Sequence, residues 1–286
     1  MRVRVWGVRG GIPSPSPHTV GLGGNTACID ILTSDKQTII LDAGTGIRSL
    51  GNTLLQENPN RILATILISH THWDHIQGFP FFAPVIGENN RNNRFVIIGQ
   101  GHVDRDLQKV LAGQIREPYL PFSFDELTAD LHIKHCHDNE TMIIGDATTV
   151  HTATLDHPGG VLGFRIENNG ASLAYCTDCT HPQDHLNPNV LRIAQNADIL
   201  FHDAQFLNLE ERQQFAHYGH SSWLEAAEVA RTANVKCLAL FHYAPDATDT
   251  IMMDILHQAR DIFPNTVLAR EGMSFTLPFP DNFLPS

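Results

Sequence analysis

Residues 70–75, His-Thr-His-Trp-Asp-His, place four potential metal ligands within six positions. They follow the apolar run 62–68, whose length and composition predict a buried strand, so the cluster lies where a strand leaves its sheet. In an extended segment His70 and His72 point the same way, and Asp74 and His75 come next. One pair can hold one metal ion while the other pair faces a second ion. Imidazole and carboxylate ligands without a thiolate favour zinc, manganese or iron over copper(I) or an iron–sulfur cluster.

This His-x-His-x-Asp-His motif after a buried strand resembles the metallo-β-lactamase superfamily. The resemblance implies an α/β fold, the four-layer αβ/βα sandwich, with residues 1–286 forming a single domain. It also implies a dinuclear site whose ligands come from several strand ends: His70, His72 and His157 on one metal, Asp74, His75 and His242 on the other, with Asp178 bridging both. Asp42 is implied as the residue that supports the histidine loop, since a ligand histidine usually donates its other N–H to a carboxylate or carbonyl.

Apolar runs of strand length precede each of these positions. They predict strands at 1–6, 27–32, 38–42, 94–98, 150–155, 171–178 and 236–241. Helical patterns predict helices ending near residue 56, at 103–115 and at 223–233. Because a sheet can deliver several strand ends to one edge, we expect the implied ligands to meet there.

Two elements in the second half indicate a branch of the superfamily. His202-Asp203-Ala204-Gln205 resembles the His-Glu-Ala-Thr element of ribonuclease Z, and Gly219-His220-Ser221-Ser222 resembles its His-Ser-Thr element. Ser222 and Glu225 predict a capping box, so His220 precedes a helix start, which favours phosphate. His220 would bind the phosphate or protonate the leaving oxygen, oriented by Asp203, unless it is only a residue at a helix start. Ser221, Ser222 and Asn25 are candidate substrate contacts.

The chain differs from ribonuclease Z in one segment. Ribonuclease Z grips transfer RNA with a long arm between its third histidine and bridging aspartate, whereas His157 and Asp178 are 21 residues apart and leave room for one strand pair. The net charge of −12 argues against gripping long nucleic acid. The chain resembles the small ribonuclease Z-like phosphodiesterases. We therefore expect a phosphodiesterase acting on a small anionic diester, foremost a 3′,5′-cyclic nucleotide opened to its monophosphate.

The implied cofactors are two divalent ions, Zn²⁺ first with Mn²⁺ as the alternative, which activate water for attack on phosphorus. Three other functions stay open. The first is a lactonase, thioesterase or β-lactamase, and the second is transfer RNA processing with an arm placed within 76–156. The third is a metal-stabilised nucleotide-binding protein without turnover.

Composition and the remaining motifs add weaker expectations. Apolar runs stay below the roughly 18 residues of a membrane span, and five scattered cysteines predict reduced thiols in a cytoplasmic protein. The resemblance implies a homodimer. Cys176 and Cys179 are a redox pair, half a zinc site or incidental thiols. His132, His135 and His137 lie on a solvated strand face or form an accessory metal site. The loop 7–26 contacts phosphate or only connects strands, and the aromatic segments 79–82 and 119–122 wall a pocket for a flat base or pack in the core.

Overall fold

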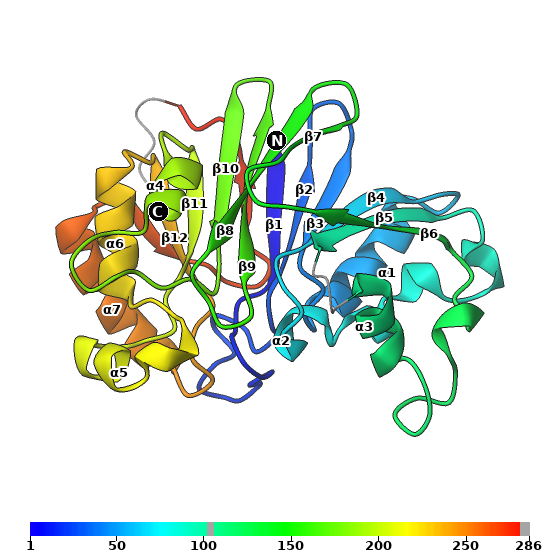
Figure 1. Ribbon diagram of the computed structural model, residues 1–286, viewed down its shortest axis with the longest axis horizontal. Coiled ribbons are helices and arrows are strands. Elements are labelled where there is room, and N and C mark those ends of the chain that lie inside the picture. The colour runs from blue at the N-terminus through cyan, green and yellow to red at the C-terminus, as the bar shows by residue number, and fades with distance from the viewer. Residues whose placement is uncertain (102–105, 281–286) are drawn as a thin grey trace.

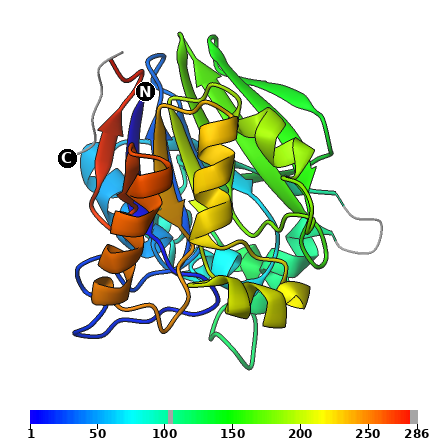
Figure 2. The same ribbon diagram turned by 90° about the vertical axis from the view of Figure 1, so that its left-hand side faces the viewer.

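The computed structural model describes residues 1–101 and 106–280. Within these residues two seven-stranded sheets lie face to face, with helices on both outer sides (Figure 1). Helices α1 and α3 cover the first sheet, and α4, α6 and α7 cover the second, as the turned view in Figure 2 also shows for α6 and α7. The predicted αβ/βα sandwich is confirmed.

Both sheets are mixed. The first has the order β14 (Ser274–Thr276), β1 (Arg2–Gly7), β2 (Cys28–Leu32), β3 (Thr38–Leu41), β4 (Leu63–Ile68), β5 (Arg94–Gln100) and β6 (Asp130–Cys136). The second has the order β13 (Thr266–Leu268), β12 (Cys237–Phe241), β11 (Ile199–Asp203), β10 (Ala171–Cys176), β9 (Val161–Asn168), β8 (Thr148–Leu155) and β7 (Thr141–Ile144). Strands β3 to β6 are parallel, as are β10 to β13, so each sheet has an edge where several strands end together.

The α-helices are α1 (Ile47–Glu57), α2 (Trp73–Ile76), α3 (Leu107–Gln114), α4 (Pro188–Ala194), α5 (Leu209–Gln214), α6 (Trp223–Thr232) and α7 (Asp249–Ile262). Short 3₁₀ turns are η1 (Phe79–Phe81), η2 (Ala83–Val85), η3 (Glu88–Asn90), η4 (Phe124–Glu126) and η5 (Ala216–Tyr218). The helix expected at 103–115 is present from Leu107, and 103–105 lie outside the described residues. In the described part of the chain, none of the helices has the length and apolar character needed to cross a bilayer.

The alternation of side chains along the strands divides the core. In β3, Ile39 and Leu41 join the cluster between the two sheets, whereas Ile40 between them joins the cluster under α1. Successive side chains of a strand point to opposite faces, so a fully apolar strand packs on both sides. This explains why the buried strands read as continuous apolar runs, and why polar side chains are left for the strand ends.

The other sequence-based expectations for the fold are met with small shifts at element ends. The segment between His157 and Asp178 holds the antiparallel pair β9 and β10, as predicted. The five cysteines all lie in the described residues, where they are buried and free of disulfides.

Candidate dinuclear metal centre

The side chains expected to bind metal meet at one end of the sandwich. Asp42 follows β3, His70 follows β4, Asp178 follows β10 and His242 follows β12. Helix α2 carries Asp74 and His75 and lies at this end in Figure 1. The remaining histidines, His72 and His157, belong to the same group as His70 and Asp178, whose ligand atoms lie within 4.8 Å of one another. The expected convergence is therefore found, although the ligand roles stay predictions.

Asp178 connects two groups of histidines. Its Oδ1 lies 3.7 Å from His70 Nε2 and 3.8 Å from His157 Nε2. Its Oδ2 lies 3.1 Å from His75 Nε2 and 3.2 Å from His242 Nε2. Each carboxylate oxygen thus faces one group, which is the geometry that a bridging ligand requires.

The remaining distances match the spacing of metal ligands. His157 Nε2 lies 3.0 Å from His72 Nδ1. Asp74 Oδ2 lies 3.2 Å from His242 Nε2 and 3.4 Å from His75 Nε2. Tetrahedral zinc ligands at about 2.0–2.1 Å from the metal stand roughly 3.3 Å from one another. The donor set and its spacing therefore fit two divalent ions.

The electrostatics of His70 and Asp74 also fit bound cations. Burial and the neighbouring His75 hold the pKa of His70 well below its ordinary value, so the ring is neutral, and its buried Nε2 has no hydrogen-bond partner. Burial opposes ionisation of Asp74, but His75 and His242 outweigh it and hold the pKa of Asp74 far below its ordinary value. Neutral imidazole and ionised carboxylate are the forms that bind metal.

Asp42 holds the histidine loop from behind. Its Oδ1 accepts a hydrogen bond from the Ser69 amide (2.7 Å). Its Oδ2 accepts from the Ser69 hydroxyl (2.9 Å) and the Tyr175 hydroxyl (2.8 Å), and lies 2.8 Å from His75 Nδ1. The bond to Nδ1 leaves His75 Nε2 facing Asp178. Sequence reasoning anticipated this place for Asp42 but missed Tyr175, because a tyrosine inside an apolar strand carries no signal of its partner.

Two further histidines of the site, His157 and His242, pack closely against glycines. His157 Nδ1 lies 2.9 Å from the Gly219 carbonyl oxygen, to which it donates, and this leaves Nε2 for the centre. A Cβ at Gly219 would lie 2.3 Å from Pro158 Cδ and 2.8 Å from His157 Nδ1, and its φ is +77°. Both facts require glycine at this position. His242 packs against Gly10. A Cβ added at Gly10 would lie within 2.5 Å of His242 Nδ1 and of Gln205 Oε1. Neither of these two atoms has a hydrogen-bond partner recorded for the described residues.

Three residues of the site have strained backbones. Asp42, Asp178 and His242 have φ values of 60°, 50° and 60°. Left-handed conformations are uncommon for residues other than glycine and asparagine, and such strain clusters at functional sites. All three directly or almost directly follow parallel strands, where the backbone turns sharply enough to aim the side chain into the centre. Nothing in the sequence marks these angles.

His220 stands beside the centre. Its Nδ1 lies 2.7 Å from Asp203 Oδ2 and 3.9 Å from Asp178 Oδ1. Burial lowers the pKa of His220, but the charge of Asp203 and the hydrogen bond to it outweigh burial and raise the pKa to about 9. The ring is therefore an imidazolium at neutral pH, and the contact with Asp203 leaves Nε2–H as a donor.

The helix start after His220 forms the capping box that the sequence predicts. The capping box of α6 is present, with the Ser222 hydroxyl accepting from the Glu225 amide at 3.3 Å. Glu225 Oε2 in turn accepts from the Ser222 amide at 2.8 Å, so this amide is already bound to a carboxylate of the protein. The phosphate site expected beside this helix start stays a prediction.

The expected substrate contacts are engaged elsewhere. The hydroxyl of Ser221 donates to the Cys179 carbonyl at 2.5 Å, and both Ser221 and Ser222 are fully buried. Asn25 donates through Nδ2 to Glu271 Oε2 at 2.9 Å. These bonds engage the three side chains within the fold, and their contact with a substrate stays a prediction.

The N-terminal loop closes over part of the centre. The Gly11 amide donates to Asp74 Oδ2 at 2.7 Å. Arg9, fully buried, anchors the loop through hydrogen bonds to the carbonyls of Gly23 (2.8 Å) and Ala247 (2.5 Å). The loop thus contacts a carboxylate of the protein, which sequence reasoning did not foresee, although its glycines signalled close approach of backbone.

A second group of ligand-type side chains lies behind Asp178. Cys179, His181 and His202 are buried, with ligand atoms within 4.8 Å of one another. His181 Nδ1 accepts a hydrogen bond from the Asn187 amide at 3.0 Å, so the neutral ring carries its proton on Nε2. That nitrogen therefore has no lone pair for a metal. Cys176 is not part of this group, and Cys179 lies 3.8 Å from His202 Nε2.

The structure also shows where the histidines near β6 and the two aromatic segments lie. His132 and His135 lie exposed on β6 and His137 is exposed just after it, as expected for a solvated face. The aromatic segments divide between the two alternatives. Phe79 and Phe82 pack in the core, whereas Phe81 and Tyr119 line a cavity beside α2.

Comparison with known proteins agrees with this geometry. The family model of the β-lactamase superfamily domain matches residues 37–243, and the chain therefore belongs to the metallo-β-lactamase superfamily. Ribonuclease Z from Treponema denticola is 24% identical over 313 residues, covering 97% of this chain and 98% of that protein. Ribonuclease Z from Metallosphaera sedula is 28% identical over 270 residues, covering 83% and 88%. These similarities agree with the predicted branch.

Solved structures share the fold. The metallo-β-lactamase fold protein YhfI from Bacillus subtilis has a TM-score of 0.69 at 19% identity, covering 96% of this chain and 98% of its own. The short form of human tRNase Z has a TM-score of 0.67 at 17% identity, with 98% and 100% covered. A diphosphatase from the PhnP family has a TM-score of 0.66 at 18% identity, with 97% and 98% covered.

Proposed function

We propose that the protein is a dinuclear-metal hydrolase of phosphodiester bonds, with small 3′,5′-cyclic nucleotides as its substrates and nucleoside monophosphates as its products. The observation that carries the dinuclear assignment is Asp178, whose two oxygens face two separate histidine groups. In this proposal His70, His72 and His157 hold one ion, Asp74, His75 and His242 hold the other, and Asp42 supports the loop. The residues 1–286 act as one domain.

The chemistry follows from the placement of the side chains. Two divalent ions bound there would supply Lewis acidity to the attacking water and to a phosphoryl oxygen. His220 adds a positive charge beside the place where charge develops, and its Nε2–H can protonate the leaving oxygen. Asp203 fixes the ring and keeps it protonated. An imidazolium at this position serves an alkoxide leaving group of a phosphate diester.

The choice of a small diester rests on two facts of the chain. The connection between His157 and Asp178 is a strand pair, and the net charge is −12. A groove for long nucleic acid requires clustered Lys and Arg to neutralise phosphates. A single diester needs only the positive charge of the centre itself.

Product analysis tests the proposal. Metal-loaded protein is incubated with cyclic AMP, cyclic GMP and the pyrimidine 3′,5′-cyclic nucleotides, and the products are separated by chromatography. We expect monophosphates from the native protein and none from Asp74→Ala or His157→Ala, whose folds are checked by circular dichroism. Hydrolysis of carboxylic esters or lactones without any diester would replace the proposal by the carbonyl-directed alternatives. Nucleotide binding without turnover would make the protein a binding protein.

His220 has its own test. We expect His220→Ala to lower kcat about 100-fold, within the range for removal of a general acid. His217→Ala is the matched control, since His217 is exposed three residues earlier and makes no contact with the centre among those recorded for the described residues. An unchanged kcat in His220→Ala would remove the residue from the mechanism.

A second candidate, cleavage of RNA, is favoured by one observation: the relatives that align with nearly the whole chain are named ribonuclease Z. The same assay with a precursor transfer RNA separates the two. Rapid cleavage of the precursor, with cyclic nucleotides untouched, would establish this candidate.

Three attributes complete the proposal. We expect Zn²⁺ in the native centre, with Mn²⁺ as the alternative, and elemental analysis of protein purified without added metal decides between them. Sedimentation velocity tests the expected homodimer. Cell fractionation tests the expected cytoplasmic location.

A further inference from the structure

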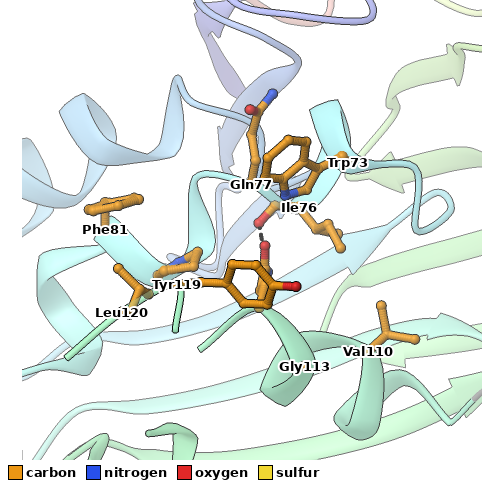
Figure 3. A pocket seen from close by; sticks show the side chains of 10 residues that line it. Trp73, Ile76, Gln77, Phe81, Val110, Gly113, Tyr119 and Leu120 are labelled. Atoms are coloured by element: carbon orange, nitrogen blue, oxygen red, sulfur yellow. Dashed lines mark hydrogen bonds between the residues drawn. The ribbon is translucent and has the colours of Figure 1, made fainter. Parts of the chain in front are cut away.

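A cavity of about 530 Å³ lies against helix α2, which also carries Asp74 and His75 of the candidate centre. Side chains from α2, from α3 and from the segment after α3 surround it, as Figure 3 shows for Trp73, Val110 and Tyr119. Among the described residues that line it, none carries a charge. Its size falls within the range of small-molecule sites, which are mostly apolar with a few polar groups.

The two faces of α2 connect the cavity to the centre. Trp73, Ile76 and Gln77 line the cavity, and they are spaced three and four apart, so they share one face of the helical turn. Asp74 and His75 between them point to the metal centre. At the helix start, Trp73 of the cavity lies in the chain directly between His72 and Asp74 of the candidate centre, so the two sites are neighbours along α2.

The aromatic side chains of the cavity are unusually exposed. Trp73 is 71% exposed, Tyr119 69% and Phe81 55%. Large aromatic side chains gathered around one concave apolar surface mark a binding site more often than a solvated face. Phe79 and Phe82, from the same segment as Phe81, are buried in the core, so the segment was free to bury its third ring as well.

The lining also sets the chemistry of the ligand. An uncharged wall gives no place for a phosphate, whereas aromatic faces stack flat rings of any base. Gln114 donates through Nε2 to the Ile76 carbonyl at 3.0 Å, and its Oε1 accepts no hydrogen bond recorded for the described residues. That oxygen can accept from an exocyclic amino group. Resting on the proposed function, we infer that this cavity binds the base of the nucleotide whose phosphodiester is cleaved, with Trp73 and Tyr119 as the stacking residues.

The test compares two substrates that differ only in the base. One is cyclic AMP, and the other is 1-O-methyl ribofuranose 3′,5′-cyclic phosphate, which has a methoxy group in place of adenine. Tyr119→Leu and Trp73→Leu remove a ring and keep apolar bulk at exposed positions. Ile143→Ala is the control, since Ile143 is 67% exposed on β7 and does not line the cavity.

For each ring variant we expect kcat/KM for cyclic AMP to fall roughly ten-fold, a typical loss when one base–aromatic stack is removed. We expect the base-free substrate to be unaffected and the control to match the native protein with both. An equal loss for both substrates, or no loss for either, would overturn the inference.

A binding measurement keeps this test separate from the proposed function. If the native protein hydrolyses neither substrate, the proposed function fails, and equilibrium dialysis with AMP then examines the cavity alone. Roughly ten-fold weaker binding in both ring variants, with native binding in Ile143→Ala, supports the base site. Equal binding in all forms overturns it. So does a change from dimer to monomer in Tyr119→Leu with unaltered substrate preference, because the cavity would then be a contact between two copies.

Discussion

The centre around Asp178 and the group of Cys179, His181 and His202 behind it contain similar side chains, but they differ in their carboxylates and in the hydrogen bond made by His181. In the centre, Asp42 and the Gly219 carbonyl take the Nδ1 protons of His75 and His157, so the Nε2 lone pairs face inward. Behind it, His202 Nδ1 likewise donates to the Asp203 carbonyl, but the Asn187 amide donates to His181 Nδ1 and leaves the proton of that ring on Nε2.

The difference teaches that residue types and proximity do not define a metal site. The ligand atoms of Cys179, His181 and His202 lie within 4.8 Å of one another, as do those of the histidine groups around Asp178. Only the centre around Asp178 has carboxylates among its members. In the group behind it, His202 also has a carbonyl behind its Nδ1, so the missing carboxylates and the protonated Nε2 of His181 make the difference. We therefore expect two ions per chain, both around Asp178.

The largest expected effect comes from removing the shared ligand. Asp178→Ala should lose both ions and lower phosphodiester hydrolysis more than about 1000-fold, because each group loses the carboxylate oxygen that faces it. Elemental analysis and turnover of bis-p-nitrophenyl phosphate measure the two losses. Asp184→Ala is the control, since that carboxylate is 86% exposed. Retention of two tightly bound ions in Asp178→Ala would contradict the bridging role.

The support behind the histidines should matter next. Asp42→Asn keeps the shape of the side chain but cannot accept all of its present hydrogen bonds, and we expect metal affinity to fall about 10- to 100-fold. Tyr175→Phe removes one of those bonds and should have a smaller effect in the same direction. Competition with a metal-binding dye measures both. Native affinity in Asp42→Asn would show that the orientation of His75 does not depend on this carboxylate.

The group behind the centre should contribute no ion. Cys179→Ala should leave metal content at the native value and turnover within about three-fold, because the thiol is a buried packing residue hydrogen-bonded to the Cys176 carbonyl. Loss of one ion per chain in this variant would show that the second group is also a metal site.

The smallest expected effect is on stability at low pH. Burial, with the charges of His202 and Arg212, lowers the pKa of His181 from 6.5 to about 2. Below pH 6.5 the unfolded chain therefore binds a proton that the folded chain does not, and stability falls as the pH falls toward 2. His181→Asn keeps an acceptor for the Asn187 amide without a titrating ring. Between pH 6.5 and 5.5 the free energy of unfolding should fall about 1 kcal/mol less in the variant, measured with urea. Parallel curves would show that His181 is protonated in the folded state.

The sequence was sufficient to predict the fold and the meeting of the implied ligands. Each ligand position follows an apolar run, and buried parallel strands read as such runs, so strand ends could be located without knowing how the sheets stack. The placement of Asp42 beside the histidine loop was implied by the resemblance, and the need of a ligand histidine for an acceptor gives its physical reason.

Other parts of the site could not be predicted, because they depend on contacts between distant segments. Tyr175 reaches Asp42 across the two sheets, and the Gly219 carbonyl meets His157 from another element. The left-handed backbones of Asp178 and His242 leave no mark in the sequence. The hydrogen bond between Ser221 and the Cys179 carbonyl likewise joins segments that are distant in the sequence.

One titration addresses the central claim most directly. Metal-depleted protein receives increasing Zn²⁺ or Mn²⁺ while hydrolysis of a phosphodiester is followed together with the bound metal. We predict that activity rises and reaches its plateau at two ions per chain, and that the group of Cys179, His181 and His202 takes up no third ion. A plateau at one ion, or no hydrolysis with two ions bound, would contradict the account.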